Sequence, residues 1–347
     1  MRKSRSVLTV GGVAGLAAVA LVAASTFANA SDDAFTRSAT ATVFYPNPVT
    51  TLGNESLVDG KDADAPVFGA AYAQVTLNHL DGSGHLVGQF VRVKSATGQA
   101  ATASGGAFPP YHRDADQFEQ VMGYYWVDTA QEYLQHLGFG STLRPVNQRQ
   151  IELRIDQFGG DNSFFREDKA NITLGKGGVD DAEDAEVILH EYGHSVQDGQ
   201  VAGFGTTLES GAIGEAFGDY LAVVVTSWKT GVPTLTPEPC VADWDSVSYT
   251  STTPHCLRRL DGTKVYPDDV VGEVHADGEI WSRALWDIRK ALGDTRATTL
   301  IVEAQFAFTV DITFHDAALA TVAAAQRLYG SHAAAATRAA FEARGIL

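Results

Sequence analysis

The sequence contains few cysteines and few basic side chains. Its only two cysteines, Cys240 and Cys256, can close a short disulfide loop in an oxidising compartment, and two free thiols are the alternative. Lysine and arginine number 25 against 42 aspartates and glutamates, which gives a formal net charge of -17. A surface that binds phosphates must be basic, so this charge balance argues against a nucleic-acid partner.

Long apolar runs are also absent, apart from one at the N-terminus that extends from Val7 to about Thr26. Basic residues precede it, and Ala28-Asn29-Ala30 follows it as a small-x-small cleavage site. A transmembrane anchor is the alternative. We expect residues 1–30 to be a signal peptide, the mature chain to start at Ser31, and the protein to be secreted into the extracellular space without membrane association.

The rest of the chain divides into a strand-rich part and a mainly helical part. With 45% hydrophobic residues, it can bury a large core without a metal or a disulfide driving folding. Alternation of apolar and polar residues predicts strands between about 40 and 93, and a Gly/Ala/Ser stretch predicts a loop at 95–107. Short apolar runs predict strands at 151–155 and 172–174. Helical periodicity predicts helices at 116–137, 184–198, 207–228, 277–292, 295–308, 315–329 and 331–343.

His190-Glu191-Tyr192-Gly193-His194 has the spacing of a zinc-binding helix. Residues four apart lie on one helix face, so His190 and His194 can bind the same metal ion. Catalytic zinc takes three protein ligands and a water, and two histidines with a glutamate form one known set, which Glu215 can complete. Glu191 faces the bound water and suits a general base. Because zinc lowers the pKa of that water to about 7, a carboxylate can deprotonate it.

Asp219 lies four residues after Glu215, on the same face of the second predicted helix. A histidine that binds metal nearly always donates its other N–H to a carboxylate or carbonyl, and Asp219 is suitably spaced to accept from His190. The alternative for Asp219 is a solvated helix residue. The alternative for the His-Glu-x-x-His (HExxH) string is an ordinary polar helix face. The combination of the string with both acidic residues favours a zinc site.

HEYGH together with LESGAIGEAFGDY resembles the thermolysin family, and HEYGH with GEVHADGEIWSRALWDI is similar to the related fungalysin-type zinc peptidases. The similarity extends roughly from Tyr111 to the C-terminus. It implies a zincin-like, two-lobed α+β fold, with a β-containing N-terminal lobe and a mainly helical C-terminal lobe. It also implies a zinc-dependent endopeptidase that cuts polypeptides with Glu191 as base, and a preference for bulky apolar residues after the scissile bond.

The resemblance assigns further roles by position. His275 matches a histidine that donates a hydrogen bond to the oxyanion of the transition state. Asn162 and Ser163 lie in the segment that binds the substrate backbone as an added strand. Arg258, or else Arg259, lies where the family places an arginine on the substrate carbonyl. The alternatives are a structural role for His275, an ordinary turn for Asn162 and a surface salt bridge for Arg258.

Two family features are not matched. The family carries a tyrosine about eleven residues after the second histidine, where this chain has Gly203-Phe204-Gly205. Either the oxyanion depends more on His275 and zinc, or another tyrosine, such as Tyr220 or Tyr266, takes that place. Bound calcium, Ca²⁺, is a side hypothesis, because acidic residues also favour the start of a helix for electrostatic reasons. The acidic run that could bind calcium comprises Asp180, Asp181, Glu183, Asp184 and Glu186.

We therefore predict a β-rich N-terminal region at 31–105, a peptidase lobe with the active-site helix at 106–198, and a helical lobe at 199–347, in a monomer with one catalytic Zn²⁺. Residues 31–99 either cover the cleft until they are clipped or leave the enzyme active once exported. Two other functions remain open. One is a catalytically silent binding protein on the same fold, and the other is an exopeptidase. The presence of the base with all three ligands favours an enzyme.

Overall fold

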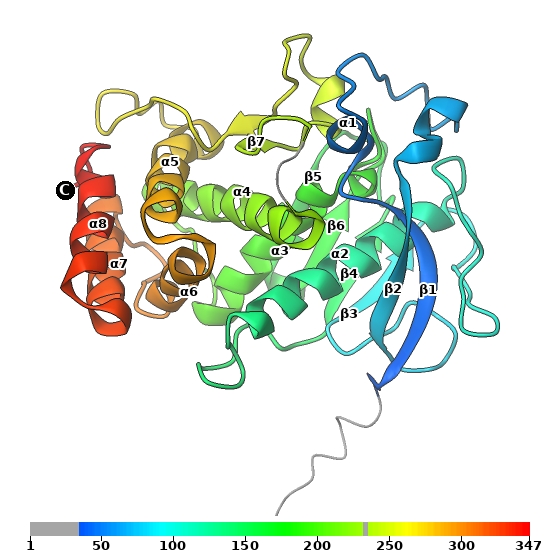
Figure 1. Ribbon diagram of the computed structural model, residues 1–347, viewed down its shortest axis with the longest axis horizontal. Helices are drawn as coiled ribbons and strands as arrows, with labels where there is room; N and C mark the ends of the chain where they lie inside the picture. The colour runs from blue at the N-terminus through cyan, green and yellow to red at the C-terminus, as the bar shows by residue number, and fades with distance from the viewer. Residues whose placement is uncertain (1–34, 232–234) are drawn as a thin grey trace, which may run out of the picture.

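The computed structural model describes residues 35–231 and 235–347, so the predicted signal peptide lies outside the described residues. Figure 1 shows two long helices, α3 (Ala185–Gln200) and α4 (Leu208–Thr230), in the middle of the molecule, with the main strands on one side and the C-terminal helices on the other. This arrangement confirms the predicted α+β fold of two lobes.

The strands of the N-terminal lobe form two sheets. In the first, β1 (Arg37–Phe44) pairs with β2 (Tyr72–Leu80) in an antiparallel ribbon. The second has the order β3-β4-β6-β5, in which only β5 is antiparallel to its neighbour. Its strands are β3 (Val91–Ser95), β4 (Ile151–Ile155), β5 (Ser163–Arg166) and β6 (Asn171–Leu174). Because β3 pairs with β4, this one sheet contains residues from both sides of the predicted region boundary at position 105.

The helix α2 (Gln117–His136) packs closely on this sheet. A Cβ atom on Gly123 would lie 2.4 Å from Cδ2 of Leu153, so any larger residue here would displace the Leu153 side chain. Leu153 is completely buried, as are its strand neighbours Ile151 and Ile155. The alternating apolar residues of β4 therefore form the core between the sheet and α2.

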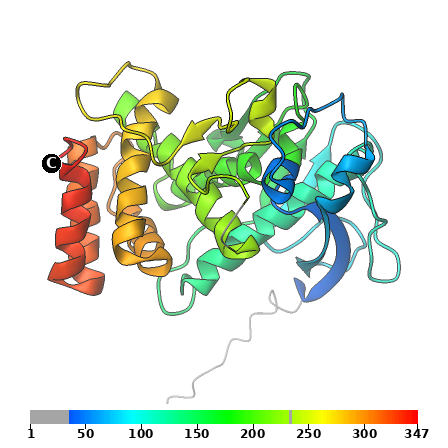
Figure 2. The ribbon, with the colours of Figure 1, turned by 45° about the horizontal axis from the view of Figure 1, so that its top comes forward.

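The C-terminal lobe consists of helices that follow one another with short connections. In Figure 2, α7 and α8 lie side by side at the end of the molecule that carries the C-terminus. The helices are α5 (Val274–Leu292), α6 (Asp294–Gln305), α7 (Phe314–Tyr329) and α8 (Ser331–Glu342). Shorter elements are α1 (Pro48–Leu52), β7 (Cys240–Val241), β8 (Arg258–Arg259) and 3-10 helices at Pro66–Ala70, Glu167–Lys169, Asp181–Glu183 and Asp245–Ser248. No helix of the described residues is long and apolar enough to cross a membrane.

The start of α5 differs from the prediction. It begins at Val274 because the Glu273 side chain accepts hydrogen bonds from the backbone N–H groups of His275 and Ala276. Serine, threonine, aspartate and asparagine are the usual caps, so a glutamate gave no clear start signal. His275 consequently lies inside the first turn of the helix.

The two cysteines form a disulfide. Cys240 and Cys256 are bonded, with 5.2 Å between their Cα atoms, and no free cysteine is present among the described residues. The bond closes the loop between β7 and β8, and this loop borders the active-site region described below. The free-thiol alternative is wrong.

Candidate metal and active site

A close crossing of α3 and α4 positions the three predicted metal ligands. A Cβ atom on Gly193 would lie 2.8 Å from the Cα of Gly218, so glycines at the crossing let the two helix backbones approach each other. The side chain of Asp184 caps α3, and Thr207 with Ser210 forms a capping box at the start of α4. Both helix starts are thereby fixed, which sets the register of the crossing.

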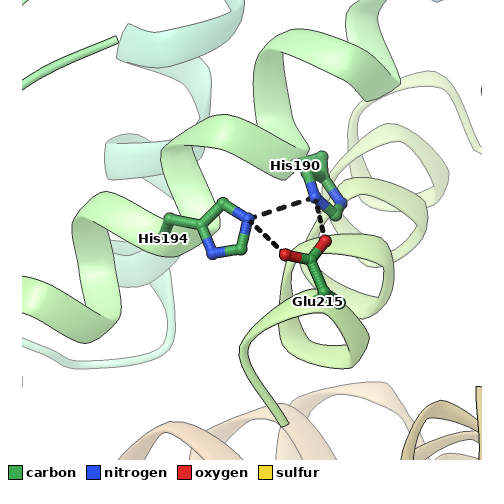
Figure 3. Close-up of side chains that lie close together, drawn as sticks. All are labelled: His190, His194 and Glu215. Atoms are coloured by element: carbon green, nitrogen blue, oxygen red, sulfur yellow. Dashed lines mark hydrogen bonds and ion pairs between the residues drawn. The ribbon is translucent and has the colours of Figure 1, made fainter. Parts of the chain in front are cut away.

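His190 and His194 on α3 point toward Glu215 on α4 (Figure 3). The two Nε2 atoms are 3.2 Å apart, and Oε2 of Glu215 is 3.2 Å from Nε2 of His190. The other carboxylate oxygen, Oε1, is 3.7 Å from Nε2 of His194. Ligand atoms placed tetrahedrally around zinc at bond lengths near 2.1 Å are about 3.4 Å apart. The three side chains therefore fit a zinc ion.

Asp219 and Arg258 hold His190 from behind. Oδ1 of Asp219 lies 2.8 Å from Nδ1 of His190, and Arg258 donates from Nε and Nη2 to the two carboxylate oxygens at 2.7 and 2.6 Å. Burial raises the pKa of Asp219, but the Arg258 ion pair and the His190 hydrogen bond outweigh it and lower that pKa to about 2. An ionised Asp219 accepts the Nδ1 proton of His190, which leaves Nε2 as the ligand atom.

Glu191 is buried next to the ligands. Its Oε2 atom has no hydrogen-bond partner in the described part of the chain. Burial raises the pKa of Glu191 to about 7, with His190 lowering it and Glu215 raising it. An unpartnered carboxylate oxygen beside three converging ligands can accept a proton from a water molecule there.

The three predicted ligands and Glu191 line a cavity of about 370 Å³, together with His275, Asn162 and Ser163. Nε2 of His275 lies 3.2 Å from Oε2 of Glu215, and its Nδ1 lies 2.6 Å from Oε1 of Glu273. Glu273 thus orients the histidine ring as well as capping its helix, a role that was not expected from the sequence.

Ser163 begins β5 and Asn162 directly precedes it; β5 is an edge strand because it pairs only with β6 in its sheet. The Ser163 hydroxyl donates a hydrogen bond to Oδ2 of Asp181. An edge strand along a cavity has backbone groups that an extended peptide can pair with. The role of Asn162 and Ser163 in substrate binding stays a prediction.

Of the two candidate arginines, only Arg258 reaches the site. Arg259 forms an ion pair with Asp261, with Nε 2.8 Å from Oδ1. Arg258 is occupied with Asp219, so the structure gives it a role in holding the Asp219 carboxylate. Its contact with a substrate carbonyl stays a prediction.

Neither of the two tyrosines suggested as a replacement lies at the cavity. Phe204 and Gly205 line the cavity where that tyrosine was expected. Tyr220 is buried against Thr298, and the Tyr266 hydroxyl lies 3.2 Å from Glu209. Neither Tyr220 nor Tyr266 lines the cavity, and this leaves His275 as the candidate donor to an oxyanion.

The acidic run at 180–186 does not form one calcium site. Glu183, Asp184 and Glu186 accept hydrogen bonds from protein donors. The run passes through a 3-10 helix into α3, so successive side chains point in different directions. Asp180 joins a buried group with Glu119 and Asp156, whereas Asp181 joins Asp161 and Asp245.

An HExxH helix, a glutamate on the next helix and a cavity between a sheet-containing and a helical lobe define a metallopeptidase. The comparisons agree. Residues 202–346 match the family model of the thermolysin metallopeptidase, alpha-helical domain. This match supports the thermolysin-like metallopeptidase that the sequence motifs predicted, and it covers the helical lobe.

The fold has a solved counterpart. The precursor of protealysin, a metalloproteinase from Serratia proteamaculans, superposes with a TM-score of 0.52 over 74% of this chain and 87% of its own. The two are 15% identical, so the likeness concerns the fold alone. No curated protein matches the chain by sequence.

Proposed function

We propose that the protein is a secreted, zinc-dependent endopeptidase, with His190, His194 and Glu215 as zinc ligands and Glu191 as general base. The observation that carries the proposal is the convergence of the three ligand atoms at the spacing of tetrahedral zinc, next to the unpartnered oxygen of Glu191. Two imidazole nitrogens and one carboxylate are a donor set of catalytic zinc sites. When bound, zinc would acidify a water molecule and polarise the substrate carbonyl.

The residues of the chain supply the remaining steps. Glu191 Oε2 takes a proton from water and delivers it to the leaving amine. His275 Nε2 donates a hydrogen bond to the oxygen of the tetrahedral transition state, and Glu273 keeps that ring in place. The edge of β5, near Asn162, aligns the substrate as an extended strand. A catalytically silent binding protein would not need a general base and an oxyanion donor in the same cavity.

Cleavage within a chain separates an endopeptidase from an exopeptidase. The test is a peptide that is acetylated at its N-terminus and amidated at its C-terminus, with products identified by mass spectrometry. An endopeptidase cuts this peptide at an internal bond. Intact blocked peptide, alongside digestion of the same peptide with free ends, would show an exopeptidase.

We infer that the mature protein keeps the region from Ser31 to residue 99. Within it, β3 pairs with β4 of the central sheet, and Asn47 Nδ2 donates to Oδ1 of Asp243 at 2.6 Å. Removing the region would expose the buried faces of this sheet and of α2. Sequencing the N-terminus of the secreted protein tests both inferences, and Ser31 is the expected first residue.

Asp219→Asn is expected to weaken zinc binding about 10–100-fold, because the His190 ring loses the carboxylate that orients it. Zinc affinity can be measured by competition with a chromophoric chelator. The exposed Asp114→Asn is the matched control, since it removes the same charge outside the site. Equal zinc affinities of the two variants would contradict the role of Asp219.

Calcium finds better support where Asp180, the first residue of the acidic run, meets Glu119 and Asp156 than along the run as a whole. The three carboxylates are buried and close together, and Oε2 of Glu119 and Oδ1 of Asp156 have no hydrogen-bond partner in the described chain. Burial and neighbouring carboxylates such as Asp62 raise the pKa of Asp180 to about 9. We propose that Ca²⁺ binds here, because oxygen ligands of this charge suit it.

Saturating calcium is therefore expected to raise the melting temperature by about 5 °C, since a ligand that binds only the folded state stabilises it by mass action. Differential scanning calorimetry with calcium or a calcium chelator measures the shift. Glu119→Gln removes one ligand charge and is expected to abolish the shift, whereas Asp114→Asn keeps it. A shift of the same size in all three proteins would place calcium elsewhere.

A further inference from the structure

A second, smaller cavity opens beside the proposed active site. Its volume is about 90 Å³, and it shares five lining residues with the larger cavity. The shared residues are Asn162, Ser163, His190, Glu191 and His275. A side chain in the smaller cavity would therefore belong to a substrate residue next to the bond that is cut.

Carboxylates gather at this cavity. Asp181 and Asp245 line it with only 2% and 3% of their surfaces exposed, and Asp161 lies within 4.8 Å of both. Oδ1 of Asp245 has no hydrogen-bond partner in the described part of the chain. Asp181 accepts from Ser163 and Gly175, and Asp161 accepts from Tyr249. The partners of these carboxylates are all neutral groups.

No ion pair of the described residues balances this group. Among the described residues, none of the three aspartates forms an ion pair with a lysine, arginine or histidine. Arg258 also lines the cavity, but it is paired with Asp219, and its charge offsets only part of the rise in the pKa of Asp245. Burial, with repulsion from Asp181, raises the pKa of Asp245. Buried carboxylates without a counter-ion are costly, so the arrangement favours a cation from outside the chain.

The walls of the cavity indicate which cation fits. Val187 of α3, Val241 of β7 and Leu257 line it, and the disulfide joins the residues that precede the last two. Apolar side chains cannot coordinate a metal ion. Lysine and arginine side chains, in contrast, have a long apolar stem that can pack against such walls below a charged head. The cavity offers apolar surface for the stem and carboxylates for the head.

We propose that this cavity binds the side chain of a lysine or arginine adjacent to the scissile bond, with Asp245 and Asp181 as the residues that recognise its charge. The proposal rests on the endopeptidase function proposed above. It departs from the preference for bulky apolar residues that the resemblance implied. Two buried aspartates line this pocket beside its apolar residues.

The test uses peptides that are blocked at both ends and differ at one position only. Cleavage of a casein digest first identifies the preferred flanking position, and the peptides then carry lysine, leucine or glutamate there. We expect kcat/KM to be higher by about tenfold or more for lysine than for leucine, and lowest for glutamate. Blocked ends ensure that a free α-amine cannot supply the positive charge.

Variants then connect the preference to the pocket. Asp245→Asn keeps the shape and removes the charge, so it should lower kcat/KM for the lysine peptide about tenfold while leaving the leucine peptide nearly unchanged. Retained cleavage of the leucine peptide also shows that the variant is folded. Asp161→Asn, at a less buried carboxylate, serves as a second variant if Asp245→Asn does not fold, and Asp114→Asn is the charge-matched control.

The outcomes separate the two proposals. If the wild type cuts no peptide, the proposed endopeptidase function fails. If it cuts the leucine peptide as well as the lysine peptide, or if Asp245→Asn and Asp161→Asn keep the lysine preference, only the pocket assignment is overturned. A lysine preference that appears only in peptides with a free N-terminus would assign the carboxylates to the α-amine, and this also overturns it.

Discussion

Glu191→Gln should lower the rate of peptide hydrolysis by about 10²–10⁴-fold, which is the usual contribution of a positioned general base. Glutamine has nearly the same shape but cannot take a proton from water. Glu191 is not among the three converging ligands, and its Oε2 atom is unpartnered in the described chain. Zinc content should therefore remain that of the wild type.

The measurement is kcat/KM on a fluorogenic peptide, with the metal content of the same sample determined by atomic spectroscopy. Reduced hydrolysis with one zinc per chain assigns proton transfer to Glu191. A variant that is as active as the wild type would contradict the mechanism. A variant that has lost its zinc would show that Glu191 supports the metal site, contrary to the geometry.

His194→Ala is the second change with a large expected effect. It removes one of three ligands, and the remaining His190 and Glu215 should hold zinc too weakly to survive dialysis. Hydrolysis should fall below detection together with the zinc content. The exposed His332→Ala is the matched control, because it removes a histidine from α8, far along the chain from the ligands.

Zinc retained at one per chain in His194→Ala would contradict the assignment of the ligands. The same samples should be compared by far-UV circular dichroism. Since His194 lines the cavity and its polar contacts within the described chain are with His190 and Glu215, its loss should leave the fold intact. Unfolding of the variant would mean that the metal is also needed for stability.

Most of the candidate metal site could be predicted because its signal is local. Two histidines four residues apart point to the same side of a helix whatever surrounds it, and Glu215 with Asp219 repeats that spacing on the next helix. The sequence could not show why the two helices meet. Their close approach depends on Gly193 facing Gly218, a contact between residues on different helices.

The helix boundaries were likewise predictable within a few residues, whereas contacts between distant segments were not. Pairing of β3 with β4 joins positions 60 residues apart, as in Val91 with Ile151. The aspartates of the smaller cavity come from three segments, and the neighbours Asp180 and Asp181 enter different clusters. Such groupings depend on tertiary packing, which periodicity does not report.

The central claim is zinc-dependent cleavage of polypeptides, and the most direct measurement is casein hydrolysis by the chain that starts at Ser31. The account predicts internal cleavage that a zinc chelator abolishes and that added zinc restores. Inert protein that carries one zinc per chain would contradict it. Cleavage that persists after zinc has been removed completely would contradict it as well.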